Sequence, residues 1–448
     1  MQISKRVGVL LLVIALLVGL TMGMWGCAPE AVPPQEKPPA EKPPAEKPPA
    51  EKPPPTIKVG LLGARTGPAA AYGEALAGAE WVFEQANTAG GIKSMGGAKI
   101  EWVYGNTESN VDKVVGELER LVTVEKVDAI IFSSATMEQS AGAPYFDKNK
   151  IPVLGTISTG GPLFPLNLKY WFCFSAPSDE AYGKAPINII LRGLIEEFNI
   201  KHDRIALVFC DADYIKMAKE AAIPELEAMG LTKNIVYNKL HPAKITEAMM
   251  ASVALEVKAS KPDVVIYNDI VANSTKNFKA FHELGFYPPV LVSGLSLIGY
   301  EKFWQMLGEE MMIDQIATKA VFFTALTHPK LPYPPYQEAA TKFEPWLKAK
   351  GIAATFYHYL DMQAAYALCR VWETIGTKDP EKVNDALHEI KIEEGDPHLV
   401  APLFLPALEF YPNGRPVNVT PFGAQWQEHE LELIFPLEIR TAEPVFPK

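Results

Sequence analysis

Over residues 56–293 the chain alternates short apolar runs with longer segments whose apolar residues recur at helical spacing. The first pair is IKVGLLG at residues 57–63, followed by a segment in which Ala79, Val82 and Phe83 share one helical face. Uninterrupted apolar strands that alternate with such helices are typical of parallel sheets covered by helices on both faces. The pattern therefore predicts an α/β fold built on parallel strands.

The alternation breaks at residues 170–179 and then starts again. Removal of the first 55 of the 448 residues leaves 393, enough for two cores at roughly 100–200 residues per domain. We therefore expect two α/β lobes. The C-terminal third contains one long helical segment, Met362–Gly376, and two strand-like pieces, which we expect to complete these lobes.

The N-terminus has the pattern of an export signal. Two basic residues precede an uncharged apolar stretch at residues 7–26, which is also long enough to cross a bilayer. The junction before Cys27 resembles that of a bacterial lipoprotein, although Trp25 is bulky where a small residue is usual. Two interpretations stay open: residues 1–26 are a cleaved signal peptide and Cys27 is lipidated, or the apolar helix remains as an anchor. Both place the rest of the chain outside the cytoplasm.

Residues 27–55 contain repeats of EKPPA. Proline lacks an amide donor and has a fixed φ, so this segment is incompatible with a helix or a sheet. An extended polyproline conformation, at about 3.1 Å per residue, makes it a semi-rigid tether. A docking peptide for a proline-recognising domain is the alternative, but such domains are mainly intracellular.

Charge and motif content exclude several function classes. The net charge of −11 disfavours nucleic-acid binding, which calls for clustered lysine and arginine. The chain has no Gly-x-Ser-x-Gly elbow, no phosphate-binding Gly-x-x-x-x-Gly-Lys loop and no His-Glu-x-x-His helix. Its eight histidines show no repeated ligand spacing. We therefore expect no catalytic residues, no metal and no cofactor.

Four cysteines in a chain of this length do not form a disulfide framework. Cys173, Cys210 and Cys369 lie in apolar runs and are expected to be buried free thiols. A Cys173–Cys210 disulfide is the alternative in an oxidising compartment.

Two hydroxyl-rich turns follow neighbouring predicted strands: SSATMEQS at residues 133–140 and TISTGG at residues 156–161. Ligands of open α/β sheets bind beyond the carboxyl ends of the strands. Hydroxyls beside helix N-termini favour an anion, so these turns predict a site for a carboxylate-sized group. Capping of the following helices is the alternative role for each hydroxyl.

Further motifs follow one another in a familiar order along residues 57–448. They are IKVGLLGARTGPAAAYGEALAGAEWVFEQANTAGGI, IPVLGTIST, DRIALVFCDADY, KPDVVIYND, LEFYPNGRP and the closing IFPLEIRTAEPVFP. In these motifs the chain resembles type I periplasmic binding proteins, in the leucine/isoleucine/valine-binding branch that serves ABC importers. The resemblance implies a bilobal α/β fold in which two Rossmann-like lobes with parallel sheets are joined by a three-strand hinge.

The resemblance also implies a function. The chain would be an extracytoplasmic protein on the outer face of the cytoplasmic membrane that closes on a small amino acid-like or carboxylate ligand and delivers it to ABC permease subunits. A sensory module that reports the ligand to a membrane receptor is the alternative, since lobe closure would be the same. The implied lobes are residues 57–175 plus about 323–400, and about 176–322 plus about 401–448.

Ligand contacts of the family map onto the first lobe residue by residue. Tyr72 matches the tyrosine that packs on the ligand, and Ser158 and Thr159 fall on the turn that holds the ligand carboxylate. The matching residues of the preceding strand end are Thr136 and its near neighbours Ser133 and Ser134.

In the second lobe Tyr214 matches an aromatic wall of the site. The chain departs from the family at Gly294, where amino-acid binders have an acid, and at Ile270, where a tyrosine is usual. A buried ammonium without a partner is costly, so the departure favours a carboxylate ligand with an apolar or aromatic body unless Asp269 supplies the charge. The candidate polar contacts here are Tyr267, Asn268 and Asp269.

Overall fold

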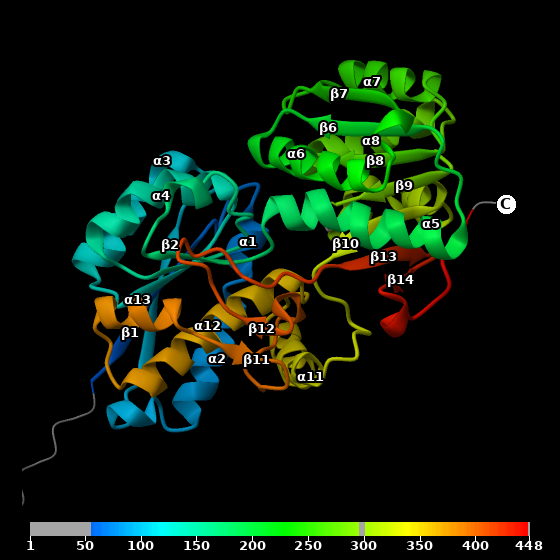
Figure 1. Ribbon diagram of the computed structural model, residues 1–448. Coiled ribbons are helices and arrows are strands. Elements are labelled where there is room, and N and C mark those ends of the chain that lie inside the picture. Colours follow the sequence, from blue (N-terminus) through cyan, green and yellow to red (C-terminus); the bar gives the residue numbers. More distant parts are fainter. Residues whose placement is uncertain (1–54, 295–300, 447–448) are drawn as a thin grey trace, which may run out of the picture. The chain divides into compact units, whose positions relative to one another are not determined.

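The computed structural model describes residues 55–294 and 301–446 (Figure 1). The predicted signal peptide, Cys27 and almost all of the predicted tether lie outside the described residues. None of the described helices is both long enough and apolar enough to span a bilayer.

The first of the two main sheets contains five strands, which come from the N-terminal part of the alternating sequence pattern. Its strand order is β2-β1-β3-β4-β5, and every neighbouring pair is parallel. The strands are β1 (Ile57–Gly63), β2 (Ile100–Asn106), β3 (Ala129–Ser133), β4 (Val153–Thr156) and β5 (Trp171–Phe174). The predicted parallel α/β arrangement is confirmed here.

Helices cover both faces of this sheet because alternate strand residues point to opposite sides. Leu61 of β1 packs in the core with α2 and α12, whereas its neighbour Leu62 packs in the core with α3 and α4. Figure 1 shows α12 beside α2. The helices are α1 (Ala70–Glu74), α2 (Ala77–Thr88), α3 (Val111–Glu119), α4 (Thr136–Asn149), α11 (Pro334–Ala349), α12 (Phe356–Ile375) and α13 (Pro380–His388).

The C-terminal third therefore contributes three helices to the first sheet, where the sequence pattern predicted one. The predicted helix at Met362–Gly376 corresponds to α12. The other two, α11 and α13, begin at Pro334 and Pro380. Proline is compatible with the first helical position, where its missing amide costs no hydrogen bond, so these prolines start helices.

The second main sheet is mixed. Its order is β14-β13-β10-β9-β8-β6-β7, with five parallel strands extended by the antiparallel β13–β14 hairpin. The strands are β6 (Ile205–Cys210), β7 (Ile235–His241), β8 (Val264–Asn268), β9 (Val290–Ser293), β10 (Val321–Ala325), β13 (Phe422–Gln427) and β14 (Glu430–Phe435). The predicted parallel sheet is thus confirmed for five strands, and the hairpin adds antiparallel pairing at one edge.

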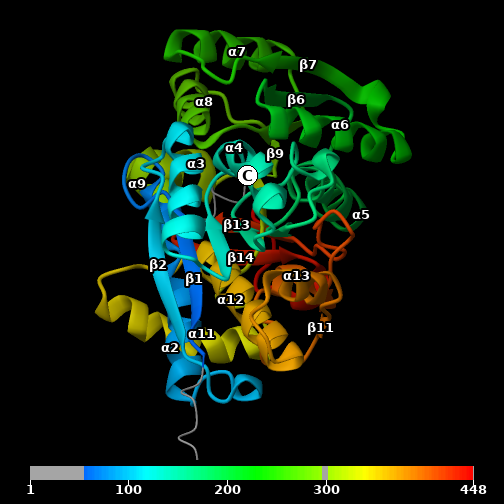
Figure 2. The same cartoon turned by 90° about the vertical axis from the view of Figure 1, so that its left-hand side faces the viewer.

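Two pairs of helices cover the second sheet. One face packs against α5 (Arg192–Phe198) and α6 (Asp213–Ala228), and the other against α7 (Glu247–Ala259) and α8 (Val271–Glu283). Figure 2 shows α6 and α8 on opposite sides of β6. Short elements of this part include α9 (Glu301–Leu307), α10 (Glu309–Met312) and the helical turns at 179–184, 186–191, 232–234, 313–317 and 437–439.

The chain passes between the two sheets three times: after β5, after β10 and before β13. In the third passage, the Cys173 amide donates to the Gly414 carbonyl at 2.8 Å, and Phe410 packs against Phe172 and Phe174. This stretch therefore lies along β5 of the first sheet. We propose that the final segment of the second lobe begins at about residue 417 and not at about 401.

The cysteines of the described chain are free. Cys173 and Cys210 are buried and Cys369 is partly buried, and no Cys173–Cys210 disulfide forms. Burial raises the pKa of each thiol to about 12, so these groups stay protonated at neutral pH.

Candidate functional site

Three predicted hydroxyl residues meet at the carboxyl edge of the first sheet. The Thr136 Oγ1 atom lies 3.2 Å from Thr159 Oγ1 and accepts a hydrogen bond from the Thr159 amide at 3.0 Å. Ser158 Oγ donates to the same Thr136 oxygen at 3.3 Å. We call Thr136, Ser158 and Thr159 the hydroxyl cluster.

A tight turn after β4 brings the cluster together. The Ser158 amide donates to the Thr156 carbonyl at 2.7 Å, and Ile157 between them has a φ of +66°. This three-residue turn is strained for a β-branched residue. The Gln139 side chain holds it in place by donating to the Thr156 carbonyl at 2.8 Å and to the Ser134 carbonyl at 2.9 Å.

The members of the hydroxyl cluster differ in accessibility. Ser158 is fully buried, Thr159 is 7% exposed and Thr136 is partly buried. Thr136 is the first residue of α4, whose N-cap residue, Ala135, provides no side-chain hydrogen bond. The first amides of a helix are donors without intrahelical acceptors, so an anion beside Thr136 and Thr159 would meet hydroxyl and amide donors together.

The structure places Ser133 and Ser134 away from this cluster. Ser133 is fully buried, and its hydroxyl lies 2.7 Å from Asp361 Oδ2 and 2.8 Å from the Tyr72 carbonyl. Thr156 donates to the other oxygen of Asp361. Ser134 is also fully buried, and its hydroxyl has no hydrogen-bond partner among the described residues.

Sequence reasoning did not identify Asp361, which α12 carries into this region. Its carboxyl is fully buried, and burial raises its pKa to about 7 even though Ser133 and Thr156 donate to it. The sequence signal was a single acid in the otherwise uncharged helical run FYHYLDMQAAYALC. This side chain joins α12 to β3 and β4 and so positions the ends of the strands that precede both hydroxyl-rich turns.

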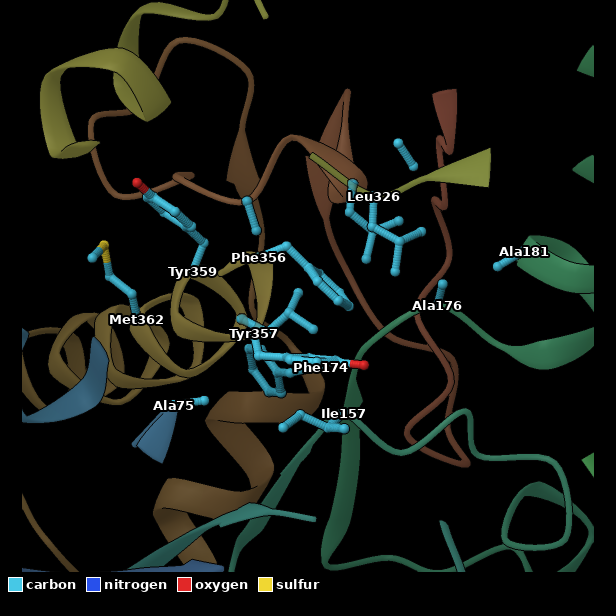
Figure 3. Packing of buried hydrophobic residues seen from close by; sticks show 14 of the residues in the cluster. Ala75, Ile157, Phe174, Ala176, Ala181, Leu326, Phe356, Tyr357, Tyr359 and Met362 are labelled. Atoms are coloured by element: carbon cyan, nitrogen blue, oxygen red, sulfur yellow. The ribbon is translucent and has the colours of Figure 1, made fainter. Parts of the chain in front are cut away.

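Two tyrosines in helices that belong with the first sheet pack together. The rings of Tyr72, in α1, and Tyr357, in α12, meet edge to face with centroids 5.3 Å apart. Figure 3 shows Tyr357 extending from the start of α12, with Phe174 and Ile157 beside it. Burial raises the pKa of Tyr72, whose ring is partly buried. Tyr357 is a candidate that the sequence motifs did not indicate.

A second pair of tyrosines lies in helical segments that belong with the other sheet. Tyr214, at the start of α6, lies 6.2 Å from Tyr182 between ring centroids. Burial raises the pKa of Tyr214 well above its ordinary value, and the nearby Tyr182 and Tyr72 raise it further. The sequence assigned Tyr72 and Tyr214 to opposite sides of one site.

The other candidates of the second lobe have internal partners. The fully buried Tyr267 donates to Ser274 Oγ at 3.1 Å. Asn268 donates to the Tyr182 carbonyl at 2.8 Å. Asp269 is fully buried, lies 2.6 Å from His241 Nε2 and accepts from the Ile270 amide at 2.7 Å and from Asn273 at 3.0 Å. These bonds occupy the groups that would otherwise contact a ligand.

Gly294 has no space for a side chain. A Cβ atom there would lie 2.4 Å from the Tyr182 Cα and 2.6 Å from Asn268 Oδ1. The Gly294 amide donates to that Asn268 oxygen at 2.9 Å, and its carbonyl accepts from Thr324 at 2.7 Å. The close approach of these segments explains why an acid is absent from this position.

A cavity of about 420 Å³ adjoins Gly161, next to the turn that carries Thr159. Phe164, Met217 and Arg415 form part of its wall. Arg415 donates to both carboxylate oxygens of Asp179, at 3.0 and 2.8 Å, so its charge is already paired. Within the described ranges, no three histidine, cysteine or acidic side chains converge in a way that could hold a metal ion.

Comparison with known proteins gives consistent matches. Residues 56–415 match the model of a family described as periplasmic binding protein. A protein of Brucella abortus (strain 2308) named Leu/Ile/Val-binding protein homolog 8 is 23% identical over 413 residues, which cover 88% of this chain and 93% of that protein. A second Brucella abortus protein, Leu/Ile/Val-binding protein homolog 7, is 23% identical over 410 residues, 88% of this chain and 94% of its own.

Solved structures share the fold over most of the chain. The branched-chain amino acid transporter substrate-binding protein LivJ of Streptococcus pneumoniae, in complex with isoleucine, has a TM-score of 0.66 and 19% identity, covering 88% of this chain and all of that one. The leucine-binding protein LivK of Thermotoga maritima has a TM-score of 0.66 and 17% identity, covering 85% and 98%. A putative branched-chain amino acid ABC transporter protein of Silicibacter pomeroyi reaches a TM-score of 0.69 at 16% identity, covering 88% and 99%.

Proposed function

Because the chain belongs to the periplasmic binding protein family, we propose that it captures a small amino acid-like or carboxylate ligand outside the cytoplasm and delivers it to an ABC permease. The family match confirms the resemblance drawn from the sequence motifs, and the solved structures confirm the fold class. The chain is accordingly a solute-binding protein and not an enzyme.

The observation that carries the proposed ligand class is the hydroxyl cluster. Thr136 and Thr159 lie at the uncapped start of α4, where hydroxyl and amide donors converge. Donors at a helix N-terminus stabilise a negative charge through hydrogen bonds and through the helix dipole. A carboxylate is the group that this arrangement fits, in keeping with relatives named for leucine, isoleucine and valine.

We further propose that the ligand lies between the Tyr72 and Tyr214 sides of the site. These tyrosines belong to helices that cover different sheets, and three chain passages connect those sheets. A ligand that contacts both sides stabilises the closed arrangement by its differential affinity for that state. The closed, loaded form would then be the form that the permease receives.

Isothermal titration calorimetry against the twenty amino acids and a set of aliphatic and aromatic carboxylic acids tests the ligand class. We expect saturable binding of at least one carboxylate-bearing compound, because the proposed anchor is an anion site. The control is 3-methylbutylamine, which has the carbon skeleton of leucine without its carboxylate and should not bind. If the amine bound and none of the carboxylate-bearing compounds in the panel did, the proposal would be contradicted. Neighbouring permease and ATPase genes would support import, whereas a neighbouring receptor gene would support sensing.

We also propose that Cys27 carries a lipid and that the proline-rich segment tethers the protein to the outer face of the membrane. The Cys27 sulfur would carry the lipid through a thioether, and cleavage before this cysteine would then remove residues 1–26. Labelled palmitate should therefore be incorporated into the wild-type protein and not into the Cys27→Ser variant. Equal labelling of the two proteins, or none in either, would exclude a lipid on this cysteine.

A further inference from the structure

A closed set of hydrogen bonds lies at the carboxyl edge of the second sheet. His241 is the last residue of β7, and Asp269 follows directly after β8. The His241 Nε2 atom lies 2.6 Å from Asp269 Oδ2, although β6 separates the two strands (Figure 1). Asn273 of α8 donates to Asp269 Oδ1 at 3.0 Å and to the Ala243 carbonyl, two residues after His241, at 2.9 Å. We call His241, Asp269 and Asn273 the buried network.

All three side chains of the buried network are shielded from water. Asp269 is fully buried, Asn273 is 1% exposed and His241 is 4% exposed. A buried carboxylate is costly unless hydrogen bonds and charge compensate it, so the position of Asp269 depends on its donors. The Nδ1 atom of His241 has no hydrogen-bond partner among the described residues. Within that part of the chain, the contact from Nε2 to Asp269 is therefore the hydrogen bond that orients the imidazole.

The buried network holds the residue at which α8 begins. Ile270 is the N-cap residue of α8 and provides no side-chain hydrogen bond to the helix. Its amide donates to Asp269 Oδ1 at 2.7 Å, and its carbonyl accepts from the Asn273 and Ser274 amides at 3.0 Å each. The backbone of Ile270 is thus fixed by the Asp269 side chain in place of a cap of its own.

Ile270 lies where open α/β sheets bind their ligands, beyond the carboxyl ends of parallel strands. Its side chain is partly buried and packs against the same core as Tyr214, which is also partly buried and lies at the start of α6. An apolar side chain at this edge favours the apolar part of a ligand. Such a contact requires that the backbone be held to within about 0.5 Å.

We propose that His241 is a positioning residue of the second lobe: through Asp269 it holds Ile270 against the apolar body of the bound ligand. The inference rests on the proposed function, because it needs a ligand at this edge, but it assumes nothing about the charged groups of that ligand. A connected polar network specifies one arrangement of the segments that it joins. Without the Nε2 donor, Asp269 would lose a partner and the start of α8 would be free to shift.

The matched variants are His241→Gln and His241→Asn, two neutral amides with the same donors and acceptors. The glutamine nitrogen reaches about as far as Nε2 and can still donate to Asp269, whereas the asparagine nitrogen ends near the Nδ1 position. Hydrogen exchange measured by mass spectrometry should show faster exchange of the peptide that contains the Ile270 amide in His241→Asn, and the wild-type rate in His241→Gln. The β6 peptide should exchange equally in all three proteins.

Calorimetry then compares two pairs of probes: L-leucine with L-alanine, and 4-methylpentanoate with propanoate. The members of a pair carry the same polar groups and differ in the apolar body. The wild type should prefer the larger member of at least one pair. His241→Asn should reduce that preference by about fourfold for each CH₂ group that loses its contact with Ile270, the usual effect of exposing one buried CH₂ group. His241→Gln should keep the wild-type preference.

Asn273→Ala opens the buried network from its other side and should act in the same direction, so it decides the question if His241→Asn does not fold. A parallel loss of affinity for both members of a pair would show a merely structural role and overturn the inference. A glutamine variant that behaves like the asparagine variant would do the same, as would a wild type that prefers neither larger probe or binds none of the four. The proposed function would survive these results as long as the wider panel contains a carboxylate-bearing ligand.

Discussion

Simultaneous Ser158→Ala and Thr159→Ala substitution is expected to weaken binding of a carboxylate ligand by roughly 10- to 150-fold, since the direct hydrogen bond from Thr159 to a charged group contributes about 1.5–3 kcal/mol. Thr159 would lose its direct donor to the ligand. Ser158 is buried and would lose the hydrogen bond that orients Thr136. Calorimetric titration of the variant with the ligand that the wild type binds measures the change in Kd.

The control removes two hydroxyls that have no part in the site. Thr88 and Thr123 each donate to a carbonyl four residues earlier in their own helical segments, and their double alanine variant should bind as the wild type does. The single Ser158→Ala change should have a smaller effect than the pair, because it alters only the support of Thr136. An unchanged Kd in the Ser158/Thr159 variant would exclude the hydroxyl cluster as the anion site.

Gly294→Ala is expected to lower the free energy of unfolding by about 3 kcal/mol, at the upper end of the usual cost of overpacking. The added Cβ would lie 2.4 Å from the Tyr182 Cα and 2.7 Å from the Tyr182 carbonyl oxygen. These are backbone atoms, so relief of the clash requires the turn at 179–184 to move away from β9. Urea unfolding followed by circular dichroism measures the loss.

Gly116→Ala is the matched glycine control. Gly116 lies within α3 and a Cβ there meets no atom within 4 Å; the change should stabilise the protein by up to about 1 kcal/mol through helix propensity. If Gly294→Ala were as stable as the wild type, the close approach of Tyr182 to Gly294 would be wrong. An acid at 294 would then be sterically acceptable, and its absence from this position would have no structural explanation.

The hydroxyl cluster shows how much of the site the sequence could predict. Thr136, Ser158 and Thr159 were identified because their turns follow neighbouring parallel strands, whose ends meet at one edge of the sheet. Ser133 was grouped with them by proximity in sequence, yet its hydroxyl turns toward Asp361 and α12. Ser133 is the last residue of β3 and Thr136 is the first residue of α4. The turn between these two elements separates the residue behind the site from the residue at the site.

Two further features of the site, the pairing of Asp269 and the packing on Tyr72, depend on contacts between segments that are distant in the sequence. Asp269 was a reasonable partner for a ligand ammonium, but His241 occupies its carboxylate. Tyr357 carried no motif, and only the fold brings it beside Tyr72. In each case the deciding fact is a contact between segments from different elements.

The sequence by itself determined the α/β class, the strands of the first repeats and the hydroxyl-rich turns, because apolar periodicity and turn chemistry act over a few residues. The run at residues 57–63, for example, corresponds to β1. Only the tertiary structure decided which polar groups remain available for a ligand. Asp361 meets its partners 205 and 228 positions away, and Gly294 is confined by Tyr182 from a separate segment. Such pairings follow from close packing of distant segments, which local periodicity does not encode.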